Sequence, residues 1–271
     1  MRVSVPASSA NLGPGFDTLG MALDLAFVLS TDPDDQLLVA EARHPAAVAF
    51  ERAGGEGPLW WRSPIPPGRG LGFSGSARVA GALLGYLHAG LSEGDARREA
   101  LALACELEHH PDNAAASMLG GIVASSGGHS VRIPMALDVA VIVWSPAVET
   151  STNKSRAALP ASIPFADAVF NVGRTALLVA ALAAGDRAAL SVATEDRMHQ
   201  DARLALSPLS ARAIEAVRGA EPIAVWLSGS GPTVAAFVDP DDVDRVSAVL
   251  PDDGVTRVLR IDEIGAQLLD Q

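Results

Sequence analysis

The chain has 271 residues, of which 49% are hydrophobic, and a formal net charge of −12. This length and apolar content allow a large buried core and exclude an intrinsically disordered chain. The negative charge argues against a nucleic-acid or acidic membrane surface, because such partners require clustered Lys and Arg. No segment approaches the roughly twenty consecutive apolar residues of a spanning helix, and the N-terminus lacks the apolar centre of a secretory signal, so we expect a cytoplasmic protein.

The first part of the chain is expected to be rich in strands, with two helices between them. Apolar residues recur at intervals of three and four in two alanine-rich segments, which predicts helices at residues 74–88 and 92–108. The single cysteine, Cys105, cannot form an internal disulfide and is expected to be a buried thiol. Alternating or apolar runs around these helices predict strands at residues 3–7, 21–29, 37–42, 121–125, 129–133 and 139–144.

The pattern changes after Pro146. It then predicts helices at residues 153–159, 165–184, 209–218 and 243–250, and strands at 224–227, 234–238 and 256–261. The whole reads as an α+β chain in two domains, residues 1–150 and 151–271, with the boundary uncertain by about ten residues.

A glycine-rich segment at residues 66–77, PPGRGLGFSGSA, leads directly into the first alanine-rich helix. Glycine lets the main chain approach a phosphate closely, and a helix start presents unpaired N–H groups and the positive end of its dipole. Ser74 and Ser76 are candidates to cap the helix, and a hydroxyl there can also reach a metal bound to the phosphates. The segment therefore favours phosphate binding over a plain flexible turn.

Two familiar nucleotide-binding motifs do not account for this segment. The chain has no G-x-x-x-x-G-K-[ST] pattern here, which excludes a P-loop. Residues 70–75 do match G-x-G-x-x-G, but a dinucleotide site needs a strand immediately before its glycines, and residues 63–69 contain three prolines. A dinucleotide-dependent oxidoreductase is therefore disfavoured.

Polar residues crowd a second segment, where one helix ends and another begins near Pro111. Adjacent side chains on a helix point about 100° apart, so His109 and His110 do not form a zinc pair, and no H-E-x-x-H spacing is present. One Mg²⁺ held by a single carboxylate and by substrate phosphates fits better. A solvated, capped helix end remains the alternative.

Several segments together resemble the GHMP family of small-molecule kinases and, within it, the members that phosphorylate homoserine. The most specific are VPASSANLGPGFD at residues 5–17, HPDNAAA at 110–116 and LSGSGPT at 227–233. With residues 66–77, 120–121, 152–156 and 198–203, the resemblance spans nearly the whole chain.

The resemblance implies a two-domain α+β GHMP kinase fold, with an N-terminal ATP-binding domain and a C-terminal ferredoxin-like α/β sandwich. It implies transfer of the terminal phosphoryl group of ATP, with Mg²⁺, to the side-chain hydroxyl of L-homoserine, giving O-phospho-L-homoserine for threonine biosynthesis. A mevalonate- or pantoate-type kinase, or a nucleotide-binding relative without turnover, are the alternatives. The resemblance leaves open whether the chain forms a homodimer.

The resemblance also implies roles for individual residues. Asn113, Ser74 and Arg203 would be catalytic, and Ser74 would lie at Mg²⁺ together with Glu106, or alternatively Glu108. The substrate residues would be Asn11, Asp17, Asn113, Arg156 and Arg203, because a zwitterion needs an anion for its ammonium group and a cation for its carboxylate. The ATP phosphates would lie against Pro66, Pro67, Gly68, Arg69, Gly70, Leu71, Gly72, Phe73, Ser74, Gly75 and Ser76.

The chain departs from the family pattern at four positions. Phe73 replaces a serine and Gly75 an alanine in the loop, so one hydroxyl is lost while the N–H groups remain. His109 stands where a glycine is usual, and Ala102 stands where some members carry the metal-binding acid.

Overall fold

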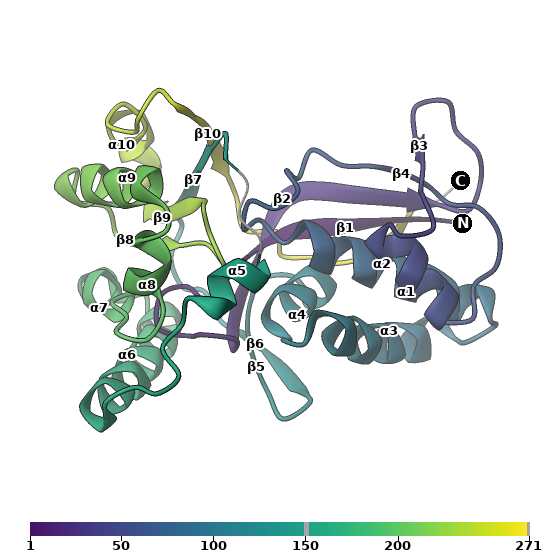
Figure 1. Cartoon of the computed structure of the whole chain (residues 1–271), viewed down its shortest axis with the longest axis horizontal. Helices are drawn as coiled ribbons and strands as arrows, with labels where there is room; N and C mark the ends of the chain where they lie inside the picture. The colour runs from purple at the N-terminus through teal and green to yellow at the C-terminus, as the bar shows by residue number, and fades with distance from the viewer. Residues whose placement is uncertain (149–151, 270–271) are drawn as a thin grey trace.

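The computed structural model describes residues 1–148 and 152–269, which form two β-sheets with helices packed on them (Figure 1). The expected α+β class is confirmed. The predicted division between residues 150 and 151 lies outside the described residues and stays a prediction. The two sheets do not follow this predicted division, because the last strand of the chain lies in the first sheet.

The first sheet is built on two long paired strands, β1 (Arg2–Ala10) and β2 (Leu19–Ser30). One end of β2 pairs with β4 and the other end with β5, so this strand links both halves of the sheet. The strand order is β11-β1-β2-β4-β3, with β5 and β6 continuing from β2. The remaining members are β3 (Leu38–Val39), β4 (Trp60–Arg62), β5 (Ile122–Ser126), β6 (His129–Ile133) and β11 (Gln267–Leu269).

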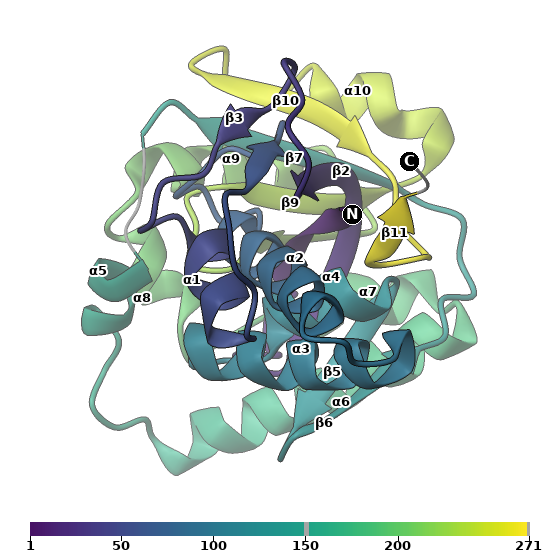
Figure 2. The ribbon, with the colours of Figure 1, turned by 90° about the vertical axis from the view of Figure 1, so that its right-hand side faces the viewer.

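Four helices belong to the first sheet: α1 (Pro45–Arg52), α2 (Phe73–His88), α3 (Glu93–Glu108) and α4 (Asp112–Leu119). Helices α2 and α4 pack on β1 and β2, while α1 and α3 pack on α2 (Figure 2). Small residues allow this close packing: a Cβ on Gly81 would lie 2.0 Å from the carbonyl oxygen of Ala46 in α1. Glycine is therefore required where α1 and α2 meet.

The second sheet has the order β10-β7-β9-β8. Helices α9 and α10 cover one face, while Trp226 and Phe237 on the other face belong to the same hydrophobic core as β1 and β2. Its strands are β7 (Ala140–Pro146), β8 (Ala224–Leu227), β9 (Val234–Val238) and β10 (Gly254–Leu259). The helices of this part are α5 (Thr152–Ala157), α6 (Phe165–Ala184), α7 (Arg187–Ala193), α8 (Gln200–Leu204), α9 (Pro208–Gly219), the 3₁₀ helix η1 (Pro240–Asp242) and α10 (Val243–Ser247).

The predicted elements are present, with one marked difference. The strand expected at residues 37–42 is reduced to the two residues of β3, whose Leu38 and Val39 side chains are exposed, because the sheet ends there and offers no core to cover them. Helices α1, α7 and α8 and strands β4 and β11 were not predicted. Each is short, so periodicity alone gives little signal for it.

Candidate active site

A cavity of about 120 Å³ lies where the glycine-rich loop, the start of α4 and helices α5 and α8 come together. Sequence-predicted residues from five separate segments line this cavity: Asn11, Asp17, Gly68, Arg69, Gly70, Gly72, Phe73, Ser74, Gly75, Asn113, Arg156 and Arg203. The predicted residues that do not line it are Pro66, Pro67, Leu71, Ser76 and Glu106. Leu71 and Ser76 are instead fully buried beneath the loop.

The glycine-rich loop has a backbone that only glycine adopts readily. Gly70 and Gly72 have φ angles of 76° and 71°. A Cβ on Gly72 would lie 2.0 Å from Ser8 Oγ, and one on Gly70 would lie 2.3 Å from the carbonyl oxygen of Ser228. The loop is therefore held in a fixed conformation against β1 and the β8–β9 connection.

Helix α2 begins at Phe73 with Gly72 as its N-cap, and no side chain caps it. The prediction that Ser74 or Ser76 caps this helix is wrong, because both hydroxyls have other partners. Ser74 Oγ donates to Glu108 Oε1 at 2.7 Å, and Ser76 Oγ donates to the carbonyl oxygen of Pro6 at 2.8 Å. The uncapped helix start therefore offers N–H groups and a positive dipole end to an anion in the cavity.

The acid beside Ser74 is Glu108, the alternative in the sequence analysis. Glu108 lines the cavity, and its carboxylate also pairs with Arg78 of α2. Glu106 lies on the outer surface, where it forms an ion pair of 2.8 Å with Arg52. Residues two apart on a helix point in nearly opposite directions, which explains why only one of the two glutamates reaches the cavity.

The lining of the cavity also includes Asp17, Arg156 and Arg203. Arg156 Nη2 donates to Asp17 Oδ1 at 2.6 Å, and Arg203 Nη1 donates to the carbonyl oxygen of Gly229 at 3.0 Å. Burial, and then the positive charge of Arg156, lower the pKa of Arg203. Its Nε is buried without a hydrogen-bond partner. An incoming anion would satisfy this crowded positive charge.

Asn11 has a structural part in the same loop. It adopts a left-handed φ of 71°. Its Nδ2 donates to the carbonyl oxygen of Gly229 at 2.9 Å, and its Oδ1 accepts from the backbone N–H of Asp17 at 3.1 Å. The Asn11 side chain thus positions Asp17 and ties the β1–β2 connection to the β8–β9 connection.

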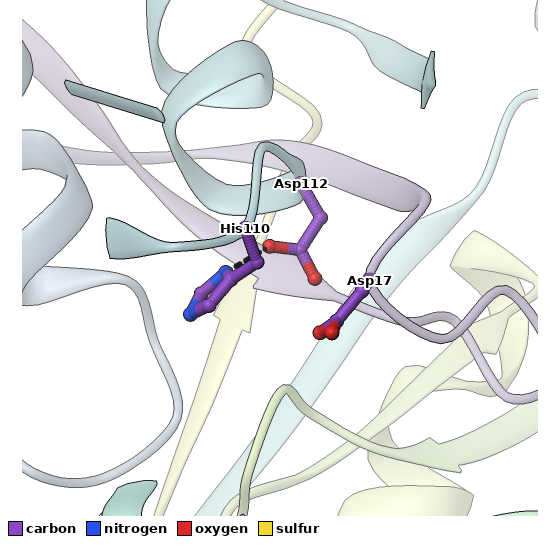
Figure 3. Close-up of side chains that lie close together, drawn as sticks. All are labelled: Asp17, His110 and Asp112. Carbon is purple, nitrogen blue, oxygen red and sulfur yellow. Dashed lines mark hydrogen bonds and ion pairs between the residues drawn. The ribbon is translucent and has the colours of Figure 1, made fainter. Parts of the chain in front are cut away.

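Four cavity residues were not predicted as functional: Gly229 and Ser230 in the β8–β9 connection, and His110 and Asp112 at the start of α4 (Figure 3). His110 Nδ1 lies 2.6 Å from Asp112 Oδ1, and this oxygen also accepts the backbone N–H of Asn113 at 2.8 Å. Burial by itself lowers the pKa of His110, but the hydrogen bond and the charge of Asp112 outweigh it and the pKa is raised. The signal was in the sequence, since HPDN places His110 and Asp112 at a helix start.

Asp17, His110 and Asp112 offer ligand atoms that lie within 4.8 Å of one another (Figure 3). A ring nitrogen is a poor ligand for Mg²⁺, which prefers oxygen. Asp17 is also already paired with Arg156. The oxygen pair Ser74 and Glu108 therefore fits Mg²⁺ better than this trio does.

Two departures from the family pattern have a structural explanation. The Phe73 ring packs edge-on against Phe27 and Trp61, each with a centroid distance of 5.7 Å, so it extends the core up to the loop. His109 ends α3 with a left-handed φ of 63°, the conformation that a glycine would adopt there. The turn before Pro111 is therefore retained.

Comparisons with known proteins identify the family of the chain. The GHMP kinases N terminal domain matches residues 39–121, and the GHMP kinases C terminal domain matches residues 178–256. The homoserine kinase of Streptomyces coelicolor is 38% identical over 99% of this chain and 94% of its own length, and that of Moorella thermoacetica is 39% identical over 87% and 86%. The crystal structure of homoserine kinase from Cytophaga hutchinsonii has the same fold, with a TM-score of 0.85 and 23% identity over 99% of this chain and 97% of that one. The chain therefore belongs to the GHMP kinase family, in its homoserine kinase branch.

Proposed function

We propose that this chain transfers the terminal phosphoryl group of ATP to the side-chain hydroxyl of L-homoserine, giving O-phospho-L-homoserine for threonine biosynthesis. The observation that carries the proposal is one shared cavity, in which the uncapped start of α2 lies beside Asp17, Asn113 and Arg203. The homoserine kinases among its relatives support the same substrate.

The ATP phosphates lie against the loop at residues 68–75 and the first N–H groups of α2. Because the net charge of the chain is −12, its overall field does not attract ATP, so these local N–H groups supply most of the attraction. Arg69 anchors the loop, since its Nη1 donates to the carbonyl oxygen of Pro146 and its Nη2 to that of Ala147, both at 2.8 Å. A loop held in place needs no rearrangement when the transferring group becomes more negative.

Ser74 and Glu108 would hold Mg²⁺, because both present oxygen atoms at the cavity wall beside the start of α2. When bound, the ion would neutralise negative charge on the ATP phosphates.

Homoserine is recognised through its two charges. Its ammonium group takes the carboxylate of Asp17, and its carboxylate takes the guanidinium groups of Arg156 and Arg203. The two guanidinium carbons lie 5.5 and 5.1 Å from the centroid of the Phe16 ring, which fixes their planes from one side. A simple alcohol without a carboxylate would supply no anion to the buried guanidinium group of Arg203.

Asn113 orients the hydroxyl that attacks. Its side chain accepts from Ser8 Oγ at 2.9 Å and donates to Asp112 Oδ1 at 3.2 Å, so its amide plane is fixed. An amide does not accept a proton at neutral pH, so Asn113 is not a general base, and the phosphate itself takes the proton late. An Asn113→Ala enzyme with full kcat would contradict the orienting role.

An ADP-release assay over a panel of alcohols tests the proposal. We expect turnover with L-homoserine far above that with mevalonate, pantoate or L-serine. Faster turnover with mevalonate or pantoate would assign the chain to another GHMP activity. Retained ATP binding without turnover on any alcohol would make it a nucleotide-binding relative.

A further inference from the structure

His199 is a buried histidine that lies behind the active site. Only 2% of the residue is exposed, and it does not line the cavity, although Arg203, four residues later in α8, does. Both ring nitrogens have partners within the protein. Nε2 lies 2.7 Å from the carbonyl oxygen of Gly13, and Nδ1 lies 3.2 Å from Nη1 of Arg203. The ring therefore joins the β1–β2 connection to Arg203.

The two partners fix the tautomer of the His199 ring. A carbonyl oxygen only accepts, so Nε2 carries the proton and donates it to Gly13. A guanidinium group only donates, so Nδ1 carries a lone pair and accepts from Arg203. Burial lowers the pKa of His199, which agrees with a neutral ring. A proton on Nδ1 would place two N–H groups against each other and break the contact with Arg203.

The contact with His199 fixes the plane of the Arg203 guanidinium group. Nη1 of Arg203 donates both to His199 Nδ1 and, at 3.0 Å, to the carbonyl oxygen of Gly229. The two N–H bonds of Nη1 lie in the guanidinium plane, so two acceptors on this nitrogen set the direction of the whole group. Nε, which is buried without a hydrogen-bond partner, remains for an anion. A substrate carboxylate can accept from Nε only while this orientation is held.

The backbone at His199 is held as firmly as its ring. Asp196 Oδ2 accepts the backbone N–H groups of His199 at 2.8 Å and of Gln200 at 2.7 Å, so this carboxylate fixes the start of α8. The β1–β2 connection packs closely on the same segment, since a Cβ on Gly13 would lie 2.2 Å from the carbonyl oxygen of Thr194. The connection and the segment that carries His199 are therefore packed as one unit.

We propose that His199 is a positioning residue that gives the site its preference for an alcohol that carries a carboxylate. It acts through Arg203, whose guanidinium group it orients, and it also holds the connection that presents Asp17. One side chain thus sets the spacing between the carboxylate and ammonium subsites, which favours a substrate that carries both charges on one carbon. This role rests on the proposed transfer to L-homoserine and adds a residue that does not reach the cavity.

Two amide variants separate the two contacts of the ring. Asparagine places its Oδ1 near the position of the ring Nδ1, so His199→Asn still offers an acceptor to Arg203 but does not reach Gly13. Glutamine places its Nε2 near the position of the ring Nε2, so His199→Gln still donates to Gly13 but offers no acceptor to Arg203. Each variant is the matched control for the other, because both replace the ring by a neutral amide.

The test compares kcat and KM for L-homoserine and for 2-aminobutane-1,4-diol, in which a hydroxymethyl group replaces the carboxylate. For His199→Gln we expect the KM for L-homoserine to rise about 3- to 10-fold and the KM for ATP to stay within about twofold. Its preference for L-homoserine over the diol should fall by the same factor. His199→Asn should keep the preference of the wild type, and so should Val246→Ala, which controls for lost stability in the core beside α10. An unchanged preference in His199→Gln, or an equal loss in both amide variants, would overturn the proposal.

NMR of the protein labelled with ¹⁵N-histidine tests the ring contact without any substrate. The signals of His199 are those that disappear in His199→Asn. At about pH 7.5 we expect a neutral ring with its proton on Nε2, and a shift of the Nδ1 signal in Arg203→Leu, which removes the donor. A ring protonated on Nδ1, or an Nδ1 signal that Arg203→Leu leaves unchanged, would overturn the positioning contact. Lack of turnover of the wild type on L-homoserine, with the NMR result as expected, would refute the proposed function and leave the contact established.

Discussion

Replacement of Arg203 by leucine separates recognition of the homoserine carboxylate from the folding of the site. Arg203 is 4% exposed, and its Nη1 donates to the carbonyl oxygen of Gly229. That oxygen also accepts from Asn11 Nδ2 at 2.9 Å, so it keeps a partner in the variant. His199 Nδ1, 3.2 Å from Nη1, loses one. We therefore expect a stability loss of about 1 kcal/mol, which lowers the melting temperature by roughly 2–4 °C.

The effect on substrate should be larger. A hydrogen bond to a charged group is worth about 1.5–3 kcal/mol, which corresponds to a rise in KM for L-homoserine of roughly 10- to 150-fold. The KM for ATP should change by less than about threefold, because no bond between Arg203 and the residues of the glycine-rich loop is present in the described structure.

The assay compares L-homoserine with 2-aminobutane-1,4-diol, which lacks the carboxylate. The wild type should discriminate strongly against the diol, and Arg203→Leu should lose most of this discrimination because its activity on the diol is unchanged. Arg218→Leu, which removes an exposed arginine of α9 that pairs with Glu215, is the control and should match the wild type. Equal rises in both KM values, or discrimination that survives in Arg203→Leu, would refute the carboxylate assignment.

Three further predictions concern other parts of the site. Glu108→Gln should raise the Mg²⁺ concentration needed for half-maximal activity at least tenfold, whereas the surface variant Glu106→Gln should not change it; the reverse would restore Glu106 as the metal residue. Gly72→Ala should destabilise the fold by about 2–4 kcal/mol in urea unfolding, because Gly72 has a φ of 71° and an added Cβ would lie 2.0 Å from Ser8 Oγ. Gly94→Ala, whose Cβ would meet nothing within 4 Å, should not destabilise the fold, and equal stability of both variants would contradict the tight loop. Burial lowers the pKa of His199, so the unfolded state binds more protons than the folded state. The free energy of unfolding should therefore be highest above pH 6.5, the ordinary pKa of histidine, and should fall as the pH drops below that value. A wild type that loses no more stability than His199→Asn between pH 7 and pH 5 would show that this histidine does not titrate as expected.

The long helices and strands were predictable because their signals are local. Alanine-rich periodicity identified α2 and α3, alternation identified β1, and a continuous apolar run identified β7. Short elements such as α1 were missed because they are held by packing on α2, through Gly81, and not by a repeat of their own. In the active site, the choice between Glu106 and Glu108 depended on which face of α3 meets the cavity.

The sequence by itself determined that glycines precede a helix start and that charged residues follow it at a second helix junction, since both features depend on neighbours within a few residues. Only the tertiary structure decided that these features face one another. Ser8 contacts Asn113 across 105 residues of chain, and Asn11 contacts Gly229 across 218. Such contacts follow from how two sheets share one core, and no local pattern specifies that arrangement.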